Sequence, residues 1–145
     1  MHSFDKKIII NHNIKKLYAL VSDINQYPQF IPWCDGLKIL KKEKNFIEAE
    51  VSINALGIHE KYISTIRLFE VKRGLASILI TSNSNPFKEM ESMWLLKKID
   101  TNNSEVHFSI NFSLKSRILD FFAAEMLPSA INKILGAFEK RANEI

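Results

Sequence analysis

The residue types that carry out chemistry in proteins are few in this chain, and they are scattered. The four histidines, His2, His12, His59 and His107, lack the spacing of metal ligands, and Cys34 has no second cysteine to join them. No serine, threonine or cysteine comes with a base and an orienting group in a recognisable nucleophile arrangement. No glycine-rich phosphate loop is present either. The sequence therefore makes no positive case for catalysis, a metal site or a required cofactor, and we expect a protein that is not an enzyme.

The most unusual stretch is residues 27–34, where large apolar side chains stand beside two prolines. Tyr27, Phe30, Ile31 and Trp33 would be costly to leave in water. One interpretation is a hydrophobic plug under a loop. The other is a rigid gate over the mouth of a pocket, where these side chains touch a membrane, a ligand or a partner. Cys34, next to this cluster, is interpreted as a small packing residue rather than a reactive thiol.

The composition is typical of one globular domain. The length of 145 residues is the usual size of a single domain, and a hydrophobic fraction of 46% argues against disorder. The net charge of +4 is basic without being extreme. A single cysteine fits a reducing compartment, and no apolar run is long enough to span a bilayer. We therefore expect residues 1–145 to form one soluble, intracellular domain.

Hydrophobic periodicity predicts the elements that position these residues. Residues 4–10 are predicted as a strand, followed by a helix from residue 14 with Asn11 or Asn13 as its N-cap, and by a short helical turn within residues 23–33. Period-two alternation then predicts six more strands, with a turn at Gly57. These strands cover residues 37–42, 47–55, 62–71, 75–82, 89–97 and 106–114. The order β-α-α-β(6)-α is that of an α+β fold.

The last predicted element is a long helix over residues 117–143. Its apolar residues form a stripe at three- and four-residue spacing, which predicts a face that lies against the sheet. The stripe consists of Leu119, Phe122, Met126, Ala130, Ile134, Phe138 and Arg141, widened by Leu127, Ile131 and Leu135. Pro128 cannot donate an amide hydrogen, so we expect the helix to kink or split near residues 125–127.

A curved antiparallel sheet of about seven strands that wraps around this helix leaves two possibilities for its interior. The aromatic side chains either fill a solid core or leave an apolar pocket of roughly 300–1,000 Å³, and periodicity alone does not decide between them. If a pocket is present, the alternating strand residues and the helix stripe predict its lining. The predicted lining is Val51, Ile53, Tyr62, Ile66, Trp94, Phe108, Ile110 and Phe112 from the sheet, with Phe122, Met126, Ala130 and Ile134 from the helix.

Three segments resemble a known family. Residues 21–34, VSDINQYPQFIPWC, closely resemble the V-x-D-[IV]-x-x-Y-P-x-F-[LIV]-P-W-C signature of the coenzyme Q-binding START-like family, part of the polyketide cyclase/START superfamily. Residues 85–94 are similar to the family's G-P-F-k-x-L-x-G-x-W, and residues 137–142 to its A-F-x-x-R-A. Asn85 and Ser92 stand where the family usually has glycine, which could alter a turn and narrow the pocket beside Trp94.

The resemblance implies a helix-grip fold whose cavity holds a polyisoprenoid quinone such as ubiquinone. It further implies a lipid chaperone for respiration, located in the bacterial cytoplasm with peripheral contact to the inner membrane, and no DNA partner. Bacterial members are also named ribosome-association toxins, so the alternative is a toxin that binds the large ribosomal subunit and blocks translation initiation. A third hypothesis is an aromatase/cyclase-like enzyme, because related folds host such activity.

Apart from the family resemblance, the ribosome-binding alternative is supported by a group of lysines. A basic surface that they form together would favour RNA, although we prefer the interpretation of a solvated surface whose lysines reflect the codon bias of an AT-rich genome. The lysines in question are Lys6, Lys7, Lys15, Lys16, Lys38, Lys41, Lys42 and Lys44.

Overall fold

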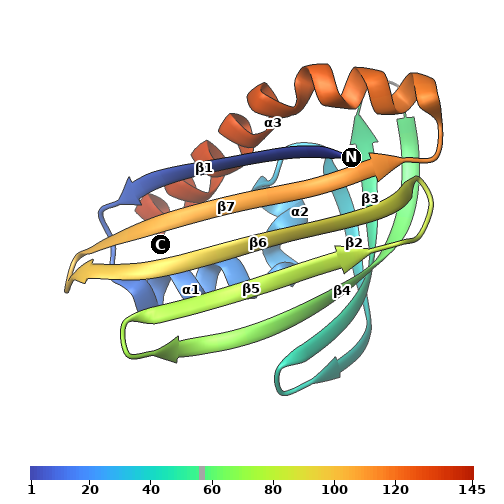
Figure 1. The fold of residues 1–145 in the computed structure, drawn as a ribbon. Helices are drawn as coiled ribbons and strands as arrows, with labels where there is room; N and C mark the ends of the chain where they lie inside the picture. The colour runs from blue at the N-terminus through green and yellow to red at the C-terminus, as the bar shows by residue number, and fades with distance from the viewer. Residues whose placement is uncertain (56–57) are drawn as a thin grey trace.

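The computed structural model describes residues 1–55 and 58–145, and within them one antiparallel sheet faces the helices (Figure 1). The strands are β1 (His2–Ile10), β2 (Cys34–Glu43), β3 (Phe46–Ala55), β4 (Ile58–Lys72), β5 (Leu75–Ser82), β6 (Phe87–Asp100) and β7 (Asn103–Leu114). The helices are α1 (Ile14–Ser22), the 3₁₀ turn η1 (Ile24–Gln26), α2 (Tyr27–Phe30) and α3 (Arg117–Glu144). The predicted α+β order is confirmed, whereas the predicted turn at Gly57 lies outside the described residues.

The seven strands lie in the order β1-β7-β6-β5-β4-β3-β2, so β1 and β2 are the two edges of the sheet. Consecutive strands from β2 to β7 pair antiparallel, and β1 pairs with β7. The alternation predicted for β7 is observed, because Val106, Phe108 and Phe112 are buried while the intervening residues are not. The register is therefore the predicted one, since a slip by one residue would expose this whole set.

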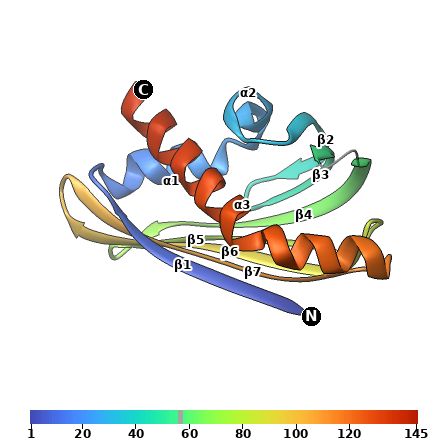
Figure 2. The same ribbon diagram turned by 90° about the horizontal axis from the view of Figure 1, so that it is seen from above.

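The helices lie on one face of the sheet, and the core forms between the two layers (Figure 2). The side chain of Asn13 accepts a hydrogen bond from the backbone N–H of Lys15 at 2.8 Å, which caps α1 as predicted. From α1, Leu17 and Val21 are buried in this core. Among the described residues, no helix combines the length and apolar character needed to cross a membrane.

Helix α3 is continuous from Arg117 to Glu144 but changes direction part-way along its length, which Figure 2 shows clearly. Pro128 lies inside the helix, has no N–H to donate to the preceding turn and crowds the carbonyl there. The expected kink is therefore present, and the helix is not split. At its start, the Ser116 hydroxyl accepts a hydrogen bond from the Leu119 N–H at 3.4 Å.

The buried face of α3 agrees with the predicted, widened stripe after Pro128 but not before it. Its fully buried residues are Ile131, Leu135, Phe138 and Ala142, all of which follow Pro128. Three of the predicted residues belong to this set, namely Phe138 from the stripe and Ile131 and Leu135 from its widening, whereas the predicted Phe122 and Met126 are exposed. The helix is apolar around most of its circumference, so the sequence pattern does not determine which side faces the sheet.

Candidate functional site

An apolar cavity of about 240 Å³ lies between the sheet and the middle of α3. Its sheet side consists of Ile110 and Phe112 from β7 and Phe87 from the start of β6. Its helix side comes from the segment around Pro128, and Trp33 completes the wall. The residues contributed by α3 are Ala123, Met126, Leu127, Ser129, Ala130 and Lys133. Such walls suit a hydrophobic ligand.

An aromatic cluster around Phe138 limits how far the cavity extends. The Phe138 ring lies 4.5 Å from the Trp94 ring, 5.1 Å from Phe30 and 5.4 Å from Tyr27, measured between centroids. Trp94 in turn packs on Phe108 at 4.8 Å. These rings fill the space below the second half of α3. The cavity is therefore confined to the stretch of α3 between Ala123 and Lys133 and to the part of the sheet beneath it.

Four of the predicted pocket residues line this cavity: Ile110, Phe112, Met126 and Ala130. The other eight do not line this cavity in the structure. Ile66, Trp94 and Phe108 are buried in the closed core, with Val51, Ile53 and Tyr62 part-buried on the sheet and Ile134 packed against the core from α3. Phe122 points to solvent because the first half of α3 turns a different side to the sheet than periodicity suggested.

The predicted gate divides into two parts. Tyr27 and Phe30 belong to the aromatic cluster described above, and Ile31 packs against the core, which matches the plug interpretation. The Tyr27 hydroxyl donates a hydrogen bond to the carbonyl of Val21, and burial raises the pKa of Tyr27. Trp33 differs from these three, because it lines the cavity.

Trp33 is held at the cavity in an unusual conformation. Its φ of 67° lies in the left-handed region, which bulky side chains rarely adopt. Its carbonyl accepts a hydrogen bond from the Asn54 N–H at 2.9 Å, and the Lys133 ammonium lies 5.8 Å from the centre of its ring. Such backbone strain persists where the surroundings enforce it, often at binding sites. The Trp33–Lys133 pair therefore marks the polar rim of an otherwise apolar cavity.

Several lining residues escaped the sequence analysis. A register shift between Phe87 and Glu89 interrupts the alternation of β6, so the predicted strand began after Phe87. Lys133 was not singled out, because nothing in the sequence pattern distinguishes it from the other lysines. For Phe87, the similarity of residues 85–94 to a family motif was the available signal.

Buried ionisable groups near the core are held in their neutral forms. Burial raises the pKa of the Cys34 thiol, which disfavours the reactive thiolate and agrees with a packing role. Burial likewise raises the pKa of Tyr62, whose ring packs at 5.0 Å on the ring of Phe87. Neither group is poised to act as a base or nucleophile near neutral pH.

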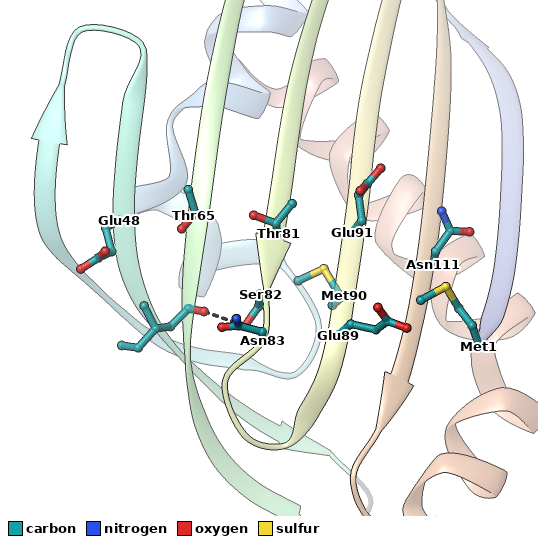
Figure 3. Close-up of a pocket in the computed structure, with 11 residues that line it drawn as sticks. Met1, Glu48, Thr65, Thr81, Ser82, Asn83, Glu89, Met90, Glu91 and Asn111 are labelled. Atoms are coloured by element: carbon teal, nitrogen blue, oxygen red, sulfur yellow. Dashed lines mark hydrogen bonds between the residues drawn. The ribbon is translucent and has the colours of Figure 1, made fainter.

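A second, polar hollow of about 500 Å³ lies on the opposite face of the sheet, away from the helices (Figure 3). Glu48, Glu89 and Glu91 line it together with Ser82, whose hydroxyl donates a hydrogen bond to the carbonyl of Ile63 at 2.6 Å. Carboxylates of like charge make this hollow unsuitable for a lipid or an anion. Within the described part of the chain, no group of three acidic, histidine or cysteine side chains is arranged to hold a metal ion.

The first turn of α3 is tied to the sheet through Asp120. One carboxylate oxygen accepts a hydrogen bond from the backbone N–H of Leu114 at 2.8 Å, and the other lies 2.6 Å from Nε2 of His2. The Leu114 hydrogen bond, followed by the one to His2, lowers the pKa of Asp120 below its usual value. These contacts fix the position of the helix beside the cavity.

Comparisons with known proteins place this geometry in context. Residues 10–139 match the family described as "Polyketide cyclase / dehydrase and lipid transport". The Rickettsia prowazekii protein named "Ribosome association toxin RatA" is 36% identical over 145 residues, which cover 100% of this chain and 99% of that protein. The Xenopus laevis protein named "Coenzyme Q-binding protein COQ10 homolog B, mitochondrial" is 24% identical, and the match covers 98% of this chain and 58% of that protein.

Solved structures show the same fold at lower sequence identity. A START superfamily protein from Mycobacterium smegmatis superposes with a TM-score of 0.82 at 14% identity, covering 99% of both chains. The Zhui aromatase/cyclase from Streptomyces sp. R1128 gives a TM-score of 0.79 at 13% identity, covering 98% of this chain and 93% of the other. The helix-grip expectation is thereby confirmed. Because one of these two neighbours is an enzyme, the fold by itself does not separate binding from catalysis.

Proposed function

Because the chain belongs to the polyketide cyclase, dehydrase and lipid transport family, we propose that it binds a polyisoprenoid quinone such as ubiquinone in the cavity beneath α3. In this role it acts as a lipid chaperone that supports respiratory electron transport, and it catalyses no reaction on its ligand. We place it in the bacterial cytoplasm, with peripheral contact to the inner membrane. The relative named as coenzyme Q-binding supports this choice of ligand.

The observation that carries the proposal is the apolar lining of the cavity. Ile110, Phe112 and Met126 offer hydrocarbon and aromatic surface on both sides, and Lys133 with Ser129 supplies the polar groups. A quinone ring has the matching chemistry, because it is flat and apolar with a few oxygens that accept hydrogen bonds. The volume of about 240 Å³ is small for a long isoprenoid tail, so part of the tail has to leave the cavity along α3.

The test fills the cavity without touching the core. Ala130 lines the cavity, whereas the nearby Ala137 on the same helix does not, so Ala130→Phe and Ala137→Phe form a matched pair. We expect lipid extracts of the purified protein to contain a quinone in the parent and in Ala137→Phe, and to lack it in Ala130→Phe at similar thermal stability. A parent protein that yields no isoprenoid lipid and binds no added short-chain quinone would refute the proposal.

The relative with 36% identity supports a second candidate, in which the chain binds the large ribosomal subunit and blocks translation initiation. The lysines contribute less to this candidate than the sequence suggested. Lys6 and Lys7 lie on β1, while Lys38, Lys41 and Lys42 lie on β2, at the opposite edge of the sheet. Lysines on edge strands also prevent strand pairing between molecules, which explains them without any RNA.

Co-sedimentation with purified large subunits tests the ribosome candidate. Charge reversal at β1 (Lys6→Glu with Lys7→Glu) and at β2 (Lys41→Glu with Lys42→Glu) asks which edge, if either, contacts RNA. Binding that weakens steeply with salt and is lost on reversal at one edge would favour this candidate. Absence of binding at low salt would remove it.

A further inference from the structure

The first half of α3 exposes a continuous apolar face. Ile118 is 70% exposed, Phe121 62%, Phe122 53% and Met126 41%. Their spacing of three and four residues places them along one side of the helix. Large apolar side chains that cluster at the surface mark an interaction site, whereas isolated ones need no explanation. The face formed by these four residues is called the α3 apolar face below.

The α3 apolar face continues into the cavity. Met126 belongs both to this face and to the cavity lining, and Ala130, one turn further along, also lines the cavity. A ligand tail that leaves the cavity beside Met126 therefore meets Phe122 next. The exposed face and the buried site form one uninterrupted apolar surface.

Cationic side chains flank the α3 apolar face. Lys115 and Arg117 are exposed immediately before it, and Lys133 stands at its far end beside Trp33. Two acidic residues lie in this part of the helix. Asp120 is turned toward His2 and the backbone of Leu114, whereas Glu125 is exposed. An apolar helix face with cations at both ends has the chemistry that binds an anionic bilayer in the plane of its surface.

We propose that the α3 apolar face docks on an anionic lipid bilayer and thereby places the mouth of the cavity at the membrane surface. This role rests on the proposed lipid-binding function, because docking would let a quinone pass between bilayer and cavity without crossing water. The helix lies on the membrane and does not span it. A second copy of the chain is the competing occupant, although nothing at the cationic ends supplies the matching negative charge that an isologous contact needs.

The experiment measures co-sedimentation of the full chain with vesicles of phosphatidylcholine alone or with roughly 30% phosphatidylglycerol added. We expect binding to the anionic vesicles only. The double variant Phe121→Ser, Phe122→Ser should weaken it at least about 10-fold. Phe69→Ser with Leu75→Ser removes two exposed apolar residues from the opposite side of the sheet and should bind like the parent. Lys115→Glu with Arg117→Glu should abolish the preference for anionic lipid.

Two further measurements separate the possible failures. Quinone binding in detergent micelles tests the cavity without a bilayer, so vesicle docking without quinone binding would refute the proposed function alone. Quinone binding with no vesicle docking, or docking unchanged by the Phe121, Phe122 substitutions, would overturn the docking inference alone. A parent dimer in light scattering that becomes a monomer in the double variant would show that the face binds a second copy instead.

Discussion

The two halves of α3 have opposite relations to the rest of the molecule. Residues 128–144 bury Ile131, Leu135, Phe138 and Ala142 against the core, although this half is rich in polar and charged residues. Residues 117–127 are mostly apolar, yet none of them is fully buried. The more apolar half of the helix is thus the less covered half.

The apolar residues of this one helix therefore serve two purposes. After Pro128 the large apolar residues of α3 stabilise the fold, because each of them packs in or against the core. Before Pro128 most apolar residues contribute surface to the cavity or to solvent, and Leu127, which lines the cavity, also packs against the core. The change of helix direction allows this, since the two halves do not have to present the same side to the sheet.

The largest expected effect comes from two phenylalanines in the two halves. Phe138→Ala removes a ring that touches Trp94, Phe30 and Tyr27, and should cost about 3–5 kcal/mol of unfolding free energy. Phe121→Ala, on the same helix, should change it by about 0.5 kcal/mol or less. Urea denaturation of both variants measures the difference. Equal losses would mean that the first half is as well packed as the second.

A smaller effect is expected at the bend. Pro128→Ala restores a backbone donor for the carbonyl of Ala124 and should stabilise the helix, by less than the roughly 3 kcal/mol that separates these residues in a helix interior. Amide hydrogen exchange within residues 117–127 should slow, which is read by mass spectrometry. Ser129→Ala is the control, because it changes the next position without adding a donor. A destabilised Pro128→Ala protein would show that packing on both sides imposes the bend.

The smallest effect concerns the link between Asp120, His2 and Leu114. Because the pKa of Asp120 is lowered in the folded protein, its contribution to stability is complete above the ordinary value of 3.8. The contribution disappears as the pH falls below that value through the lowered pKa. NMR signals of residues 117–127 should therefore respond to acid before those of the buried half. In Asp120→Asn, which cannot titrate, this early response should be absent.

The sheet could be predicted well from the sequence because its inward and outward residues alternate strictly. β5 begins and ends where alternation predicted, and β7 buries the predicted side. The strand starts were predicted less accurately, with a bulge near some of them and no bulge at β4, which begins at Ile58 rather than at residue 62. Register shifts follow Cys34 in β2 and Phe87 in β6, and both strands begin earlier than predicted.

The candidate site was only partly predictable because it depends on which side of α3 faces the sheet. A helix that is apolar around most of its circumference can bury any of several sides, and the sequence pattern favoured the side that carries Phe122. The position of Trp33 depends on a left-handed backbone conformation that no periodicity encodes. The motif in residues 21–34 did identify the segment that carries Trp33, although Tyr27, Phe30 and Ile31 pack against the core instead of lining the cavity.

The pairing of β1 with β7 has a consequence for the time course of folding. The side chains of Asp5 and His107, which lie 2.8 Å apart across these strands, are separated by 102 residues in the chain. During synthesis β1 therefore emerges long before its partner, and it waits without a neighbour while β2 to β6 form hairpins among themselves. Contacts this distant in sequence close slowly. The nascent chain thus carries an unpaired strand edge for most of its synthesis, and Lys6 and Lys7 on that strand reduce its tendency to pair with other chains in the meantime.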